Sequence, residues 1–186
     1  PCLTIGIYGC SSGTDIMNLL VQEKVDLVLH GHEHMYQRTK QIAAQRPGCQ
    51  RVLPQSYNPS CVVAEHDYLT AGAGTVFVTV GTGGTPLRAP KLVDSELGYF
   101  AAWSGKNADA TYGFLDLQFT SGRLSVSFMG VGPGQFTDAF TSAWRGVGGK
   151  VVPAAGPGVV RLRAKRPVTA EVDGDGLRPQ RFGSVP

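Results

Sequence analysis

The chain has 186 residues, with 17 Lys and Arg against 14 Asp and Glu, and carries a formal net charge of +3. This length suffices for the core of one ordinary domain, and the 25 glycines and 12 prolines indicate many turns and loops. No apolar run approaches the ~18 residues that a membrane-spanning helix needs, so the sequence predicts no membrane partner.

Charge is distributed unevenly along the chain. Residues 1–145 carry 10 Lys and Arg and 11 Asp and Glu, a net charge of −1, whereas residues 146–186 carry 7 and 3, a net charge of +4. Because the basic excess lies in the C-terminal segment, no nucleic-acid partner is predicted. That segment is also rich in Gly and Pro. We therefore expect a domain over residues 1–145, followed by a basic linker or disordered tail over residues 146–186.

The first 30 residues predict a strand, a helix and a second strand. Residues 3–8 alternate between apolar and polar positions, as a strand does, and the apolar run of residues 25–29 predicts a buried strand. Between them, Ser12 and Asp15 have the spacing of a capping box, which indicates a helix start. This order is typical of an α/β layered fold, in which ligands bind at the carboxyl edge of the strands. The apolar residues at helical spacing are Ile16, Leu19 and Leu20.

The sequence GHEH, residues 31–34, directly follows the second strand. Gly31 lets the backbone turn tightly there without a Cβ clash. The imidazoles of His32 and His34, two residues apart, can then point at one place. Because neutral imidazole is the commonest protein ligand of transition metals, this pair predicts half of a metal site. Glu33 is expected to be solvated.

With Tyr36 and Arg38 added, a strand followed by GHEH resembles the last metal-binding motif of the calcineurin-like metallophosphoesterases, in particular the purple acid phosphatases and their secreted bacterial members. The resemblance implies the C-terminal portion of a layered β-sandwich flanked by helices, with a terminal β-hairpin. It also implies two metal ions (Fe, Zn or Mn), with His32 binding one and His34 the other. Gly31, Tyr36 and Arg38 would support the loop. The implied substrate is a small phosphate ester, which a metal-bridging hydroxide would attack.

The family's other ligands come from motifs that look like DxH, GDxxxD and GNHE, and these are absent from the 186 residues. We therefore expect a C-terminal fragment that is inactive by itself. The alternative is a non-catalytic, secreted, β-rich binding module. In that module GHEH would be a structural turn, and Tyr99, Trp103 and Tyr112 would form a ligand face.

The remaining elements follow the GHEH motif. Residues 41–70 are expected to form a loop that contains a solvated His66, and residues 75–80 predict a strand that runs into a glycine-rich turn. Residues 86–107 are expected to be irregular. A hairpin is predicted after them, with Ser121 and Gly122 in its turn. The apolar positions of the two hairpin strands are Leu115, Leu117 and Phe119, and Leu124, Val126 and Phe128.

Four cysteines allow three pairings. The close spacings favour Cys2–Cys10 and Cys49–Cys61, each of which closes a short loop. The Cys49–Cys61 loop is expected to have few core contacts and so to gain stability from the bond. Disulfides persist in oxidising compartments, so this interpretation predicts a secreted, extracellular protein. The alternative is four reduced thiols in a cytosolic protein.

Overall fold

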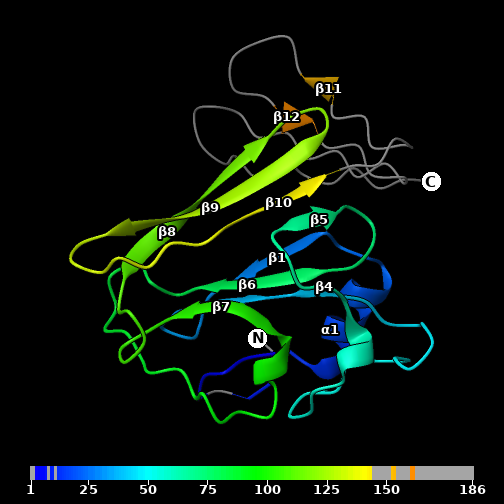
Figure 1. The fold of residues 1–186 in the computed structure, drawn as a ribbon, viewed down its shortest axis with the longest axis horizontal. Helices are drawn as coiled ribbons and strands as arrows, with labels where there is room; N and C mark the ends of the chain where they lie inside the picture. Colours follow the sequence, from blue (N-terminus) through cyan, green and yellow to red (C-terminus); the bar gives the residue numbers. More distant parts are fainter. Residues whose placement is uncertain (1–2, 8, 11, 144–151, 154–159, 162–186) are drawn as a thin grey trace, which may run out of the picture.

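The computed structural model describes residues 3–7, 9–10, 12–143, 152–153 and 160–161. In this part of the chain, two four-stranded sheets lie face to face, and one α-helix lies beside the first sheet (Figure 1). The first sheet has the strand order β1-β6-β2-β7 and the second β5-β10-β9-β8. The elements are α1 Thr14–Gln22, β1 Leu27–His30, β2 Tyr36–Thr39, β3 Gln41–Ile42, η1 Pro59–Cys61, β4 Val62–Ala64, β5 Tyr68–Thr70, β6 Val76–Val80, η2 Leu97–Tyr99, β7 Phe100–Ser104, β8 Tyr112–Phe119, β9 Arg123–Val131, β10 Ala139–Ala143, β11 Val152–Pro153 and β12 Val160–Arg161.

The first sheet is mixed, because β1 pairs with β6 in parallel while β2 is antiparallel to both β6 and β7. β6 was predicted over residues 75–80 and is confirmed, with four of its five residues buried. β1 was predicted as a buried strand, and this is wrong. It lies at the edge of the sheet, and Leu29 is 46% exposed. An apolar run therefore predicted the strand but not its place in the sheet.

One hydrophobic core fills the space between the two sheets. Side chains of β2 and β6 meet side chains of β9 and β10 there, because alternate residues of each strand point to the same face. The predicted hairpin is confirmed as β8 and β9, and its predicted apolar positions belong to this core except Phe119, which is 40% exposed. The fully enclosed members are Tyr36, Leu69, Val76, Val78, Leu124, Val126, Phe128 and Phe140.

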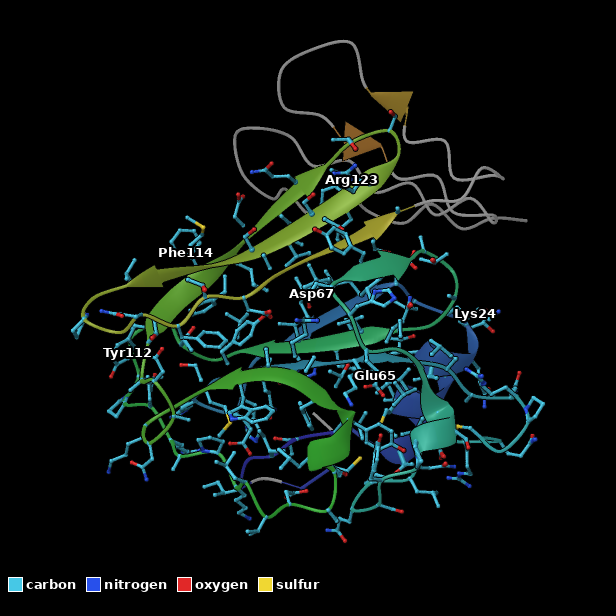
Figure 2. The ribbon with its side chains drawn as sticks, in the orientation of Figure 1. Lys24, Glu65, Asp67, Tyr112, Phe114 and Arg123 are labelled. Carbon is cyan, nitrogen blue, oxygen red and sulfur yellow. A yellow bond between two sulfur atoms is a disulfide. The ribbon has the colours of Figure 1, made fainter. Side chains whose placement is uncertain are left out.

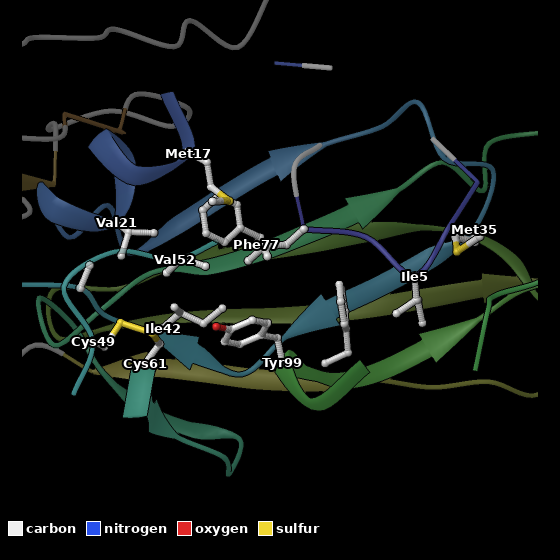
Figure 3. Close-up of a cluster of buried hydrophobic side chains, with 13 residues drawn as sticks. Ile5, Met17, Val21, Met35, Ile42, Cys49, Val52, Cys61, Phe77 and Tyr99 are labelled. Atoms are coloured by element: carbon white, nitrogen blue, oxygen red, sulfur yellow. A yellow bond between two sulfur atoms is a disulfide. The ribbon is translucent and has the colours of Figure 1, made fainter. Parts of the chain in front are cut away.

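A second core lies on the other face of the first sheet, where α1 packs (Figure 3). The helix is confirmed, and of the three apolar residues at helical spacing Leu20 packs against this core, but Ile16 and Leu19 do not. Met17 and Val21 are buried, whereas Ile16 and Leu19 are each 55% exposed. Helix α1 contacts the sheet along the row of residues spaced by four, Met17 and Val21, which places Ile16 and Leu19 outside the contact. Its N-cap residue is Gly13, and no side chain caps it.

Residues 3–7 do not form the predicted strand, although Leu3 and Ile5 are buried. Side chains satisfy the backbone donors of this segment in place of a sheet ladder. The N–H of Thr4 donates to Glu96 Oε2 at 2.9 Å, and that of Ile5 donates to Gln37 Oε1 at 3.0 Å. The alternation of apolar residues therefore indicates burial in this segment, but it does not indicate strand pairing.

Two segments that were expected to be irregular contain strands. Residues 41–70 contribute β3, β4 and β5, and residues 86–107 contribute β7. The Cys49–Cys61 disulfide is confirmed in the first of these segments, and Cys10 is also disulfide-bonded. Cys2 lies outside the described residues.

Most of the expected tail, residues 146–186, also lies outside the described residues, apart from the antiparallel pair β11 and β12. Among the described helices, none has the length and apolar character needed to cross a membrane.

Candidate functional site: a histidine loop at the carboxyl edge of two parallel strands

The GHEH loop connects β1 to β2 at one edge of the first sheet. β1 and β6 are parallel, with His30 opposite Thr79, so the GHEH loop and the glycine-rich turn of residues 81–85 leave the sheet at the same edge. The N–H of Gly81 donates to the carbonyl of Met35 at 3.0 Å. The histidine loop is therefore held directly against the turn that follows β6.

The side chains of the loop alternate in exposure. His32 is exposed and His34 is half-buried, whereas Glu33 between them is 0% exposed. The carbonyl of His34 accepts a hydrogen bond from the N–H of Arg88 at 2.8 Å. Both imidazoles are therefore accessible from outside, which a ligand role requires, while the intervening carboxylate points into the protein.

The backbone turns at His32, with a φ of 78°. Gly31 was expected to make this turn. However, its φ is not positive, and a Cβ built on it would meet nothing within 4 Å. The position where a glycine is required is Gly81, because a Cβ there would overlap the carbonyl oxygen of Glu33. A left-handed conformation at a non-glycine residue is strained, and such strain is characteristic of functional sites.

Glu33 was expected to be solvated, and this is wrong. Its carboxylate lies against Gly6 of the N-terminal segment, where any Cβ would overlap it. Its Oε2 lies 4.0 Å from Nη1 of Arg88. Gly6 and Arg88, which are distant in sequence, enclose this carboxylate, so the local sequence held no sign of its burial.

Tyr36 and Arg38, the two residues expected to support the loop, share one partner in the segment directly before β10. The hydroxyl of Tyr36 donates to Asp138 Oδ2 at 2.6 Å. Nε and Nη2 of Arg38 donate to the two oxygens of the same carboxylate at 2.6 and 2.8 Å. Arg38 Nη2 also donates a hydrogen bond to Asp67 Oδ1 at 2.7 Å. Figure 2 shows Asp67 between the two sheets. These side chains therefore join the strand after the loop to the opposite sheet.

This cluster shifts the pKa of two of its members. Burial, together with the negative charge of Asp138, raises the pKa of Tyr36 far above its ordinary value. Burial by itself lowers the pKa of Arg38, but the hydrogen bonds and charge of Asp138 and the bond to Asp67 outweigh burial, so the pKa is raised. Tyr36 therefore stays a neutral donor and Arg38 a permanent cation.

His30 is the last residue of β1. Its Nδ1 lies 3.0 Å from the hydroxyl oxygen of Thr79, its neighbour on β6. Burial lowers the pKa of His30 to about 4. This imidazole is therefore neutral at physiological pH and belongs to the sheet.

The donor set fits part of a metal site. His32 and His34 offer two accessible imidazoles from one loop, which suits a transition metal. In the part of the chain that the structure describes, no group of three or more His, Cys, Asp and Glu side chains is placed to hold a metal ion.

His66 is exposed in the turn between β4 and β5, where its Nδ1 accepts a hydrogen bond from the N–H of Tyr68 at 3.3 Å. It is a solvated loop residue, as predicted.

One residue of the ligand face expected for the alternative binding module is enclosed. Tyr99 is 0% exposed and accepts a hydrogen bond at its hydroxyl from the N–H of Asn58 at 3.0 Å. A fully buried ring cannot contact a ligand at the surface, so Tyr99 is wrong for that role, whereas Trp103 and Tyr112 are half-buried.

Three residues that shape the site were missed: Asp138, Arg88 and Gln37. Asp138 contacts Arg38 across 100 positions of sequence, and Arg88 reaches the loop from a segment expected to be irregular. Gln37 donates to both Thr4 and Thr79 from the face of β2 opposite Tyr36. Local sequence spacing holds no signal for such contacts.

No family model matches the sequence, and no curated protein matches it. Among solved structures, the chain is similar to the purple acid phosphatase PPD1 isolated from yellow lupin (Lupinus luteus) seeds, with a TM-score of 0.51 and 23% sequence identity. The match covers 73% of this chain and 20% of the phosphatase, so the chain spans about a fifth of that protein's length. The likeness shows the fold: two mixed sheets with few helices, as in part of a metallophosphoesterase β-sandwich.

Proposed function

We propose that this chain is the C-terminal part of an enzyme that hydrolyses phosphate esters at a two-metal centre. His32 would bind one metal ion and His34 the other. The observation that carries the proposal is the loop itself, in which two accessible imidazoles flank a buried carboxylate at the carboxyl edge of a parallel strand pair. The phosphatase-like fold supports the same assignment.

Two metal ions bound there would supply a hydroxide nucleophile near neutral pH and would neutralise charge that develops on the phosphate. The chain's own residues hold the ligands in place. Gly81 and Arg88 fix the backbone on either side of His34, and Tyr36 and Arg38 anchor the following strand through Asp138. Ligands held by such a frame lose little freedom when they bind a metal.

The rest of the ligand set is proposed to come from segments other than those described. Two neutral imidazoles do not balance the charge of two metal ions, and carboxylates are the usual complement. The 186 residues by themselves are therefore proposed to bind metal weakly and to turn over no phosphate ester.

We propose an extracellular location for this protein. The Cys49–Cys61 disulfide supports it, because such bonds persist in oxidising compartments. The substrate class follows from the proposed chemistry and is a small-molecule phosphate ester.

The test combines gene sequence with metal binding. The reading frame upstream of Pro1 is expected to continue into motifs of the DxH, GDxxxD and GNHE type. Calorimetric titration of the chain with Zn²⁺ or Mn²⁺ should give weak binding that His32→Ala and His34→Ala each reduce and that the double variant abolishes. His66→Ala is the matched control, since it removes an exposed histidine outside the loop.

Two results would contradict the proposal. One is binding that is unchanged in both loop variants and reduced in His66→Ala. The other is p-nitrophenyl phosphate turnover by the 186-residue chain that disappears in His32→Ala, which would show that the chain already contains a complete site.

A further inference from the structure

Glu33 is enclosed in the protein although it lies between two accessible histidines. It is 0% exposed, and its carboxylate fills the space beside Gly6 that a Cβ would otherwise need. Taking a carboxylate out of water costs several kcal/mol unless hydrogen bonds and opposite charge compensate it. The surrounding residues therefore restrict where the Glu33 side chain can lie.

Arg88 contacts the histidine loop in two ways. Its Nη1 lies 4.0 Å from Glu33 Oε2, and its backbone N–H donates to the carbonyl of His34 at 2.8 Å. The side-chain contact acts on the middle of the loop, and the backbone contact acts on the second histidine. Arg88 thus contacts both the buried carboxylate of Glu33 and the backbone of His34.

The end of β7 holds Arg88 in turn. Its carbonyl accepts a hydrogen bond from the N–H of Lys106 at 2.9 Å, and a Cβ on Gly105 would overlap the same carbonyl oxygen. On the other side of the loop, Gly81 packs against the carbonyl of Glu33. The backbone of the loop therefore lies between the turn after β6 and the segment that contains Arg88.

We propose that Glu33 and Arg88 form a positioning pair that sets the orientation of the His32 and His34 imidazoles. The pair touches neither substrate nor metal and acts through the backbone of the loop. Glu33 lies between the two histidines and its carbonyl packs against Gly81, so a shift of its side chain moves the backbone that carries both imidazoles. The inference rests on the proposed ligand role of the histidines.

The test measures the Co²⁺ affinity of the 186-residue chain from the visible absorption of the bound ion. Glu33→Gln keeps the shape of the side chain and removes its charge, and Arg88→Met removes the partner. Each is expected to weaken Co²⁺ binding about ten-fold, the size of effect seen when groups behind metal ligands are altered. The double variant should be no weaker than either single variant, since both remove the same interaction.

Arg88→Lys is the conservative variant and is expected to restore affinity to within about three-fold of the original chain, because it keeps the positive charge. Glu65→Gln is the matched control. It removes another carboxylate paired with a cation, Lys40 at 3.4 Å, but its side chain is 68% exposed and lies outside the loop. Its Co²⁺ affinity and absorption spectrum should be unchanged.

The effects of these variants on Co²⁺ binding distinguish the ligand role of the histidines from the positioning role of Glu33 and Arg88. If His32→Ala leaves Co²⁺ binding intact, the ligand role fails, and the positioning role fails with it. If His32→Ala abolishes binding while Glu33→Gln and Arg88→Met leave affinity and spectrum unchanged, only the positioning pair is overturned. Should Glu33→Gln fail to fold, Arg88→Met and Arg88→Lys decide, since the Arg88 side chain is 28% exposed and its loss is tolerated more easily.

Discussion

His32 combines an exposed imidazole with a φ of 78°, a conformation that costs an L-residue about 1–2 kcal/mol. If the strain is retained for ligand geometry, a residue without a Cβ should be more stable here. We expect His32→Gly to have a free energy of unfolding about 1 kcal/mol higher than His32→Ala. Urea unfolding followed by circular dichroism measures the difference.

The same pair of substitutions at His34 provides the control. His34 is not among the residues with positive φ, so glycine there brings only extra freedom to the unfolded chain. His34→Gly should be less stable than His34→Ala by about 0.5–1 kcal/mol. The same order of stability at both positions would contradict the assignment of strain to His32.

At this scale the sequence predicted the two histidines but not the conformation that presents them. Residue type and the preceding strand indicate His32 and His34 as candidate ligands, and that role stays a prediction. The burial of Glu33 and the need for glycine at Gly81 depend on the approach of another loop. Such an approach is set by tertiary packing and has no local sequence signal.

At the scale of elements, one ion-pair cluster joins β2 to the segment before β10. The side chains of Arg38 and Asp138 are 3% and 7% exposed, so removal of the cation leaves a carboxylate enclosed without its compensating charge. Arg38→Ala is expected to lower the free energy of unfolding by about 3–5 kcal/mol. Chemical denaturation measures this loss.

Lys40→Ala is the matched control on the same stretch of chain. Lys40 pairs with Glu65 at 3.4 Å, and that carboxylate is 68% exposed, so the loss should stay below about 1 kcal/mol and shrink with added salt. Equal losses in the two variants would show that enclosure of the Arg38 pair does not govern its contribution.

Elements were predictable where apolar alternation and turn residues agreed, as in the hairpin of β8 and β9. They were missed where strands are short, as in β3 and β4, which have two and three residues. Residues 3–7 show the opposite error, since buried apolar side chains occur there without strand pairing. Side-chain acceptors such as Gln37 and Glu96 bind that backbone, and their contribution depends on folding of the rest of the chain.

At the scale of the whole molecule, the sequence predicted a layered β-sandwich portion through its resemblance to a family, and the fold agrees. The sequence did not predict the order of strands within each sheet. β1 and β6 pair in parallel across a wide gap in sequence, and β5 joins the second sheet through β10. Both pairings bring together segments whose own patterns specify a strand but not its neighbour.

At the same scale, the position of strand β1 bears on association between copies of this chain. Among the described strands, β1 pairs only with β6, so its outer edge presents backbone donors and acceptors, and Leu29 is 46% exposed. Helix α1 adds Ile16 and Leu19 to the exposed apolar surface. Open strand edges with apolar side chains promote association between chains.

We therefore expect the 186-residue chain to self-associate with rising concentration, and Leu29→Lys to reduce this association, because charge on an edge strand opposes pairing. Sedimentation velocity over a concentration series measures both. Val93→Lys is the control, since Val93 is 98% exposed and lies in a loop outside any strand. A chain that stays monomeric over the series, or a Val93→Lys variant that reduces association as much as Leu29→Lys, would show that the β1 edge does not drive association.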